Sequence, residues 1–220
     1  MDPRIQSLID WVKTSSSPAG GLLVPVSGGS DSALCFWLCR QAFPDKTVAV
    51  YFGDTLRCRE WFERVGEVRM LPEPPAADNR EVQRWARSLA LALAEKRWLV
   101  GTRNRTEDAL GTYSLASRLV TYLPLAGLWK SDVMELCKII GVPEEITSSS
   151  RKADPDCGRP AELAEIPLEL IDTFLKVKVG ANAAEAMSAL SKQQVHYLDG
   201  LYTANRFKEN LPTKPPVSAT

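Results

Sequence analysis

Short apolar runs alternate with amphipathic stretches along most of the chain. The apolar runs are rich in Val, Leu and aromatic residues and end at turn residues, which predicts buried β-strands. These strands are expected at 21–26, 46–52, 68–71, 97–102 and 120–125. Between them, apolar residues at helical spacing predict α-helices. The expected helices cover 4–14, 33–43, 56–66, 79–96, a stretch from about 106, and 130–140.

The chain changes character beyond residue 141. A polar, turn-rich stretch at 148–160 predicts a loop, and its closure over a bound nucleotide is a hypothesis. The alternative is a plain linker. The Pro-rich tail at 211–216 predicts an extended chain end. Helices are expected between the loop and the tail, at 167–176, 182–189 and 191–201.

Strands that alternate with helices predict an α/β fold, in which a parallel sheet is covered by helices on both faces. We expect right-handed crossovers and a single domain over 1–220 that ends in C-terminal helices. Ligands of such sheets bind beyond the carboxyl ends of the strands. Because the polar motifs of this chain follow predicted strand ends, we expect one site at that edge of the sheet.

Composition narrows the class of protein. The 220 residues are 45% hydrophobic and 25% charged, and the formal net charge is zero. This balance fits a globular domain and argues against nucleic acid as a partner. No window approaches a membrane span and the N-terminus lacks a signal-peptide shape, which predicts a cytoplasmic protein without a membrane partner. The five scattered cysteines are expected to be buried free thiols in a reducing compartment.

The densest polar motif separates the first predicted strand from the first long buried helix. It reads Ser27, Gly28, Gly29, Ser30, Asp31, Ser32. The glycines allow a sharp turn and close approach of a ligand, and the helix N-terminus favours phosphate. Asp31 would repel bare phosphate unless a divalent cation lies between them. The alternative is a helix cap with a Gly turn; a Walker loop is excluded because the motif lacks its lysine.

Two further motifs follow strand ends and open helices. In the first, Thr102 offers a hydroxyl to a phosphate or ribose, and Glu107 could share a cation with Asp31. In the second, Lys130 stands at a helix start, where a cation is unfavourable unless it faces an anion such as a triphosphate. The alternative for Glu107 is a first-turn acid that the helix dipole stabilises, and the alternative for Lys130 is a solvated surface lysine.

Together these motifs resemble those of ammonia-dependent NAD synthetase, a family of the ATP pyrophosphatase (PP-loop) superfamily. That family carries Ser-Gly-Gly-x-Asp-Ser, then Gly-Thr-x-Asn-x-x-Glu, then Leu-Pro-Leu-x-x-Leu-x-Lys. The chain matches them at 27–32, 101–107 and 123–130. The resemblance continues through 140–146 to Phe207-Lys208, and so covers nearly the whole chain. It implies a Rossmann-like, adenine nucleotide alpha hydrolase-like fold.

The resemblance also implies an activity and a set of site residues. ATP adenylates the carboxylate of nicotinate adenine dinucleotide, and ammonia then displaces AMP to give NAD. Asp31 and Glu107 would hold Mg²⁺, while Thr102, Lys130 and the Ser27–Ser32 loop would contact ATP. Asp154 and Lys208 would bind the second substrate, and the family implies a homodimer.

One stretch departs from the family pattern and keeps other functions open. Where the family has Gly-Asp-Gly-Gly near its dinucleotide, this chain has 114–120, Ser-Leu-Ala-Ser-Arg-Leu-Val. The first alternative is therefore a relative that adenylates another carboxylate, or a base for sulfur transfer through Cys58 or Cys157. The second is a nucleotide-binding regulatory protein without turnover. Retention of Asp31, Glu107 and Lys130 argues against the second alternative.

Overall fold

The computed structural model describes residues 2–15, 20–75, 79–149, 161–180 and 185–211. Its strands are β1 (Leu22–Pro25), β2 (Thr47–Phe52), β3 (Val68–Leu71) and β4 (Trp98–Leu99). The helices up to residue 149 are α1 (Pro3–Ser15), α2 (Ser30–Ala42), α3 (Arg59–Val65), α4 (Arg80–Ala94), α5 (Arg105–Leu110), the 3₁₀ helix η1 (Leu115–Leu119), α6 (Lys130–Ile139) and α7 (Glu144–Ser149). The later ones are α8 (Ala161–Ala164), α9 (Leu168–Lys178), η3 (Glu185–Ala189), α10 (Lys192–Asn205) and η4 (Arg206–Asn210).

The strands form one parallel sheet in the order β3-β2-β1-β4. The predicted α/β class is confirmed. The central strand β1 belongs to the most apolar run, and it pairs with β2 on one side and β4 on the other. Helices connect successive strands, as parallel pairing requires.

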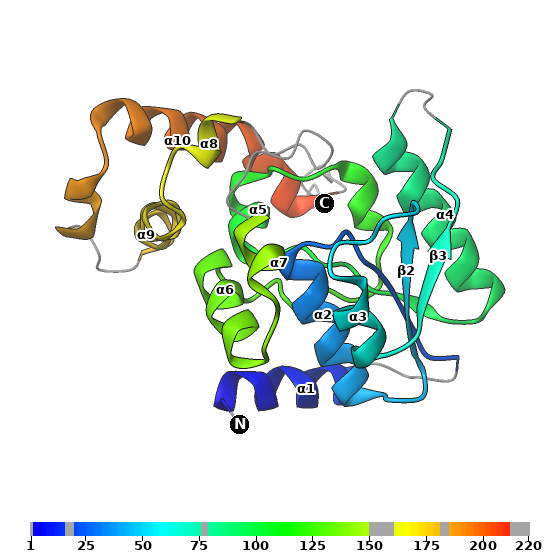
Figure 1. The fold of residues 1–220 in the computed structure, drawn as a ribbon. Coiled ribbons are helices and arrows are strands. Elements are labelled where there is room, and N and C mark those ends of the chain that lie inside the picture. The colour runs from blue at the N-terminus through cyan, green and yellow to red at the C-terminus, as the bar shows by residue number, and fades with distance from the viewer. Residues whose placement is uncertain (1, 16–19, 76–78, 150–160, 181–184, 212–220) are drawn as a thin grey trace, which may run out of the picture.

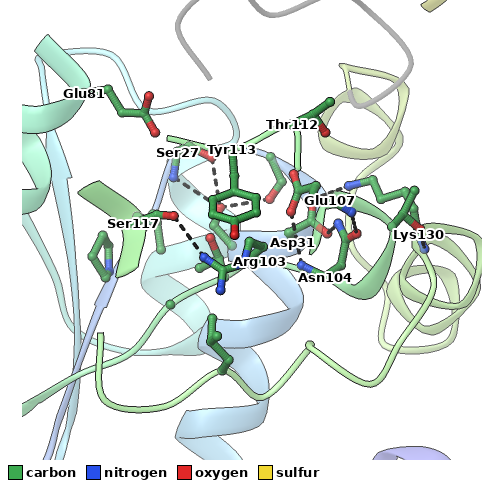
Figure 2. Close-up of a pocket in the computed structure, with 18 of the residues that line it drawn as sticks. Ser27, Asp31, Glu81, Arg103, Asn104, Glu107, Thr112, Tyr113, Ser117 and Lys130 are labelled. Atoms are coloured by element: carbon green, nitrogen blue, oxygen red, sulfur yellow. Dashed lines mark hydrogen bonds and ion pairs between the residues drawn. The ribbon is translucent and has the colours of Figure 1, made fainter. Parts of the chain in front are cut away.

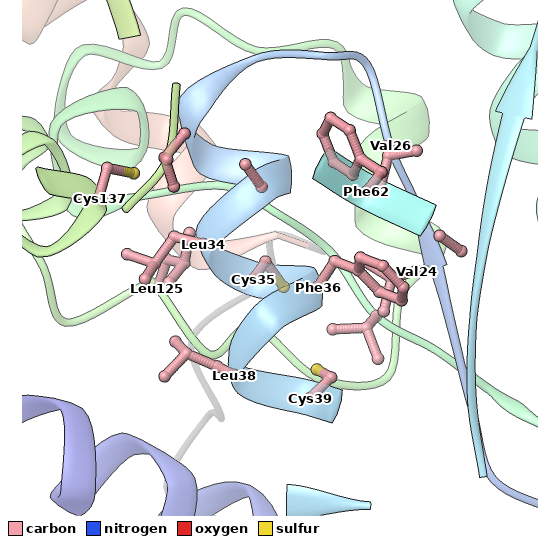
Figure 3. Packing of buried hydrophobic residues seen from close by; sticks show 14 of the residues in the cluster. Val24, Val26, Leu34, Cys35, Phe36, Leu38, Cys39, Phe62, Leu125 and Cys137 are labelled. Atoms are coloured by element: carbon pink, nitrogen blue, oxygen red, sulfur yellow. The ribbon is translucent and has the colours of Figure 1, made fainter. Parts of the chain in front are cut away.

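Helices cover both faces of the sheet, as predicted (Figure 1). Successive side chains of a strand point to opposite faces. Leu22 and Val24 therefore join the cluster beneath α1, α2, α3 and α6, whereas Leu23 joins the cluster under α4. Figure 3 shows the first cluster, in which Leu34 and Leu38 of α2 lie among the buried residues. This packing fixes the start of α2 at the carboxyl end of β1.

The prediction of a fifth strand at 120–125 is wrong. Only one parallel bridge forms there, between Val100 and Tyr122. The backbone N–H of Thr121 donates to Leu99 O over 2.8 Å, and that of Gly101 donates to Tyr122 O over 2.8 Å. Pro124 follows with no N–H to continue the ladder, and the chain turns toward α6.

The C-terminal helices have a core of their own. Ile171, Phe174 and Leu175 of α9 meet Leu198 and Tyr202 of α10 in a buried cluster that also includes residues of α5. Predicted helices at 167–176 and 191–201 are confirmed within two to four residues of their ends. Within the described part of the 182–189 prediction, the 3₁₀ helix η3 appears instead. Most of the predicted loop at 148–160 lies outside the described residues, and its first two residues end α7.

None of the described helices combines the length and apolarity needed to cross a membrane.

Candidate active site

The loop between β1 and α2 is held in a tight conformation by its own hydroxyl groups. Ser32 Oγ donates to Gly29 O over 3.0 Å, and the backbone N–H of Ser27 donates to Ser32 Oγ over 3.2 Å. Gly28 has a φ of +77°, and a Cβ there would lie 3.3 Å from Arg57 Cβ. A side chain at this position would therefore be strained and crowded. The outcome is a turn that presents the backbone of the loop and the N-terminus of α2 to one cavity.

That cavity has a volume of about 600 Å³ and lies at the carboxyl ends of the strands. Figure 2 shows that its polar side chains come from segments far apart in the sequence. The predicted site residues that line it are Ser27, Gly29, Asp31, Ser32, Thr102, Glu107 and Lys130. Of the other residues in the first motif, Ser30 is buried beside Lys130, and Gly28 shapes the turn.

Asp31 is the centre of the polar network. Its Oδ1 accepts a hydrogen bond of 2.8 Å from Asn104 Nδ2, and its Oδ2 forms an ion pair with Lys130 Nζ. Lys130 Nζ also donates to Ser30 Oγ over 2.8 Å. The Lys130 side chain is 9% exposed and that of Asp31 17%. A cation at the start of α6 is thus held toward the first turn of α2.

Glu107 lies in the first turn of α5, next to this ion pair. Asn104 Oδ1 accepts from the Glu107 N–H over 3.0 Å, and Glu107 Oε2 accepts from the Asn104 N–H over 3.1 Å. This reciprocal capping box fixes where the Glu107 side chain leaves the helix. Burial, and after it the negative charge of Asp31, raise the pKa of Glu107 to about 7, against the opposing effect of Lys130.

The donor set fits a divalent cation with oxygen ligands. Asp31 and Glu107 face the same cavity closely enough for the charge of one to raise the pKa of the other. Mg²⁺ is commonly held by one or two carboxylates plus phosphate oxygens, rather than by a cage of protein ligands. Among the described residues no group of three or more His, Cys, Asp or Glu side chains converges on one point. The pair therefore suits a cation that arrives with a phosphate ligand.

Several side chains of the cavity were not predicted as site residues. Asn104 is fully buried and joins Asp31 to the cap of α5. The Asn-x-x-Glu spacing is a capping-box pattern that could have identified it. Arg103 stacks on the Tyr113 ring, with 4.0 Å from Cζ to the ring centroid, and both line the cavity. Trp85 of α4 also lines the cavity, and no local pattern connects it to the site.

The C-terminal segment is hydrogen-bonded to the stretch at 114–120, which departs from the family pattern. Lys208 Nζ donates to Gly111 O over 2.6 Å and does not line the cavity. Arg118 donates to Lys208 O over 2.6 Å and to Leu211 O over 3.0 Å. These bonds join η4 to the residues around η1. The predicted substrate role of Lys208 stays a prediction, and Asp154 lies outside the described residues.

The described cysteines do not offer an activated thiol. Cys35, Cys39 and Cys137 are buried and free. Burial and the nearby Glu145 carboxylate raise the pKa of Cys58, whereas reactive thiols need a lowered one. Sulfur transfer through Cys58 is therefore disfavoured, and Cys157 lies outside the described residues.

Comparisons with known proteins agree with these motifs. A family model described as NAD synthase matches residues 76–212. The NH₃-dependent NAD⁺ synthetase of Carboxydothermus hydrogenoformans is 26% identical, over 88% of this chain and 92% of that protein. The enzyme of the same name from Methanosarcina acetivorans is 25% identical, over 96% of each chain.

Solved structures share the fold. NMN synthetase from Francisella tularensis superposes with a TM-score of 0.78 at 22% identity, over 97% of both chains. An NH₃-dependent NAD synthetase from Campylobacter jejuni, in complex with a nitrate ion, gives 0.75 at 18% identity, over 98% of this chain and 99% of that one.

Proposed function

The chain belongs to the NAD synthase family, and on that premise we propose that it is an ATP-dependent amide ligase. It adenylates the nicotinate carboxylate of nicotinate adenine dinucleotide and transfers ammonia to it. The products are NAD, AMP and pyrophosphate. The observation that carries this proposal is the convergence of Asp31, Glu107 and Lys130 on one cavity at the strand ends.

The chemistry has two steps. An oxygen of the substrate carboxylate attacks the α-phosphorus of ATP, and the bond to the β-phosphate oxygen breaks to release pyrophosphate. Ammonia then attacks the acyl carbon, AMP leaves, and the nitrogen loses a proton to give the amide. Neither step needs a side-chain nucleophile, so the protein acts by positioning and by electrostatic stabilisation.

The residues of the cavity divide these tasks. The N–H groups at the start of α2 and the Lys130 ammonium bind the phosphates, with Thr102 beside them. Asp31 and Glu107 would hold Mg²⁺, which when bound neutralises charge on the pyrophosphate. Asn104 keeps Asp31 oriented through its 2.8 Å hydrogen bond.

A product assay tests the proposed function. With ATP, Mg²⁺, ammonium and nicotinate adenine dinucleotide, we expect NAD, AMP and pyrophosphate in equal amounts. The assay is repeated with nicotinate mononucleotide in place of the dinucleotide. ATP binding without pyrophosphate release from either carboxylate would instead favour a regulatory nucleotide-binding protein.

The contacts of Ser117 and Arg118 favour one alternative second substrate. Ser117 Oγ accepts from Arg103 over 3.2 Å, and Arg118 is occupied by the C-terminal segment. The polar side chains that replace the family's Gly-Asp-Gly-Gly are therefore engaged within the protein. A smaller nicotinate carboxylate, such as the mononucleotide, needs fewer contacts from this stretch. A higher kcat/KM with the mononucleotide would assign that substrate.

The raised pKa of Glu107 predicts how stability depends on pH without metal. The unfolded chain loses this proton near the ordinary pKa of 4.5, whereas the folded protein keeps it up to about pH 7. The free energy of unfolding therefore falls as pH rises through that window. In thermal unfolding at pH 5 to 8, the Tm of Glu107→Gln should therefore rise relative to that of the wild type as pH increases. Mg²⁺ should raise the Tm of the wild type more at pH 8 than at pH 5.5. Glu169→Gln, at an exposed first-turn position of α9, should follow the wild type; a Glu107→Gln curve parallel to it contradicts this prediction.

We also propose that the whole chain works as one unit and pairs as a homodimer. Leu168 and Ile171 of α9 line the same cavity as the sheet residues, which supports a single functional unit. Apolar side chains are exposed on α4 and on the neighbouring η1, such as Leu93 and Leu115, and their burial against a second copy would support pairing.

A further inference from the structure

A buried carboxylate outside the predicted site joins the starts of two helices that carry site residues. Asp172 lies on α9 and is 1% exposed. Its Oδ1 accepts a hydrogen bond of 2.5 Å from Thr106 Oγ1, in the first turn of α5. Its Oδ2 accepts one of 2.7 Å from the backbone N–H of Ser131, in the first turn of α6. One side chain of the C-terminal helices thus contacts both α5 and α6.

The hydrogen bonds leave one arrangement for the Thr106 hydroxyl. Its oxygen accepts from the backbone N–H of Lys130 over 2.8 Å, so its single proton points at Asp172. The sequence of donors runs from the Lys130 N–H through Thr106 Oγ1 to the carboxylate. A second branch runs from the Ser131 N–H to the other carboxylate oxygen. Both oxygens of Asp172 are thereby used, and the relative position of the two helix starts is set.

Helix α6 needs such partners from outside. The first N–H groups of a helix have no acceptor within it, and a side chain just before the helix usually supplies one. Here Trp129 holds that position, and an indole offers only a donor. Thr106 and Asp172 supply the acceptors for the next two N–H groups. The negative charge of Asp172 also stabilises the N-terminus of α6, where the cation of Lys130 adds to the positive end of the helix dipole.

We propose that Asp172 is a positioning residue that sets the placement of Lys130 and Glu107 relative to the phosphates of ATP. This inference rests on the proposed function. The backbone N–H of Lys130 donates to Thr106 Oγ1, and that hydroxyl donates to Asp172. Glu107 is the residue after Thr106 in α5. Asp172 therefore holds the backbone from which both functional side chains extend. Misplacement of such groups by about 1 Å costs on the order of 100-fold in rate.

Three variants test the proposal. Asp172→Asn keeps the shape but places an amide group opposite one of the two donors. Thr106→Val keeps the size and removes the hydroxyl, whereas Thr106→Ser retains it. We expect the first two to lower kcat for pyrophosphate release and affinity for ATP–Mg²⁺ by about 10- to 100-fold. Thr106→Ser should keep both within about threefold, and the double variant should lose little more than the worse single one.

A matched control separates positioning from stability. Thr47 is a buried threonine at the end of the sheet away from the cavity, and its hydroxyl shares its single proton between Cys39 O and Phe43 O. Thr47→Val should lower the Tm while kcat and ATP affinity stay at wild-type values. An Asp172→Asn protein that likewise loses only Tm, or a Thr106→Ser protein as impaired as Thr106→Val, overturns the proposal. Because ATP affinity is measured without the second substrate, failure of the proposed reaction would be seen separately, as absent turnover in the wild type.

Discussion

The variant Asp31→Asn is expected to lower kcat/KM for pyrophosphate release on the order of 10³-fold. The Asp31 carboxylate of the wild type is one of the two that face the cavity near Lys130. The amide that replaces it is a poor ligand for Mg²⁺ beside phosphate. The asparagine can still accept from Asn104 through its carbonyl oxygen, so its amide nitrogen would then face the Lys130 ammonium. We therefore expect loss of ATP–Mg²⁺ binding together with the loss of rate.

The fold should survive this change, which makes the measurement clear. Asp31→Asn also removes the ion-pair partner of Lys130. Because Asp31 raises the pKa of Glu107, its replacement lowers that pKa, and an ionised Glu107 then supplies a negative charge near the Lys130 ammonium. Circular dichroism and Tm check folding, and a coupled pyrophosphate assay measures the rate. Asp45→Asn, at an exposed position beyond the other end of α2, should match the wild type. Activity within tenfold of the wild type in Asp31→Asn would refute the assignment of this carboxylate.

The second large effect is expected for Lys130→Met, in both rate and stability. Loss of a preorganised cation at the phosphates should lower kcat by about 10²- to 10³-fold. In the metal-free protein, Asp31 and Glu107 would remain with no neighbouring ammonium. Breaking a buried ion pair from one side costs about 3 kcal/mol, so the free energy of unfolding should fall by about that amount.

Denaturant unfolding with and without Mg²⁺ measures the stability effect. Mg²⁺ should restore more stability to Lys130→Met than to the wild type, because a cation then replaces the missing ammonium. Lys138→Met removes an exposed lysine from the same helix and should change neither property. If Lys130→Met matched this control in rate, the lysine would not contact the phosphates.

Local patterns were sufficient where the signal is short-range. The alternation of apolar runs and the Ser27–Ser32 motif predicted β1, its turn and the start of α2, because these depend on neighbouring residues. The prediction failed at 120–125, which has the composition of a strand. There Pro124 and the turn that follows it limit pairing to one bridge at Tyr122. A strand needs a partner along its whole length, and composition does not report that partner.

The sequence by itself determined the α/β class, the motifs, and the resemblance that predicts a shared site for Asp31, Glu107 and Lys130. Only the tertiary structure decided how they are held there. Asp31 is 73 residues from Asn104 and 99 from Lys130, so their contacts exist only after the sheet and both helix layers have formed. The role of Asp172 follows from the same cause. A buried carboxylate on a late helix has no periodicity or spacing that identifies the N–H groups it will meet, because those groups come from other helices.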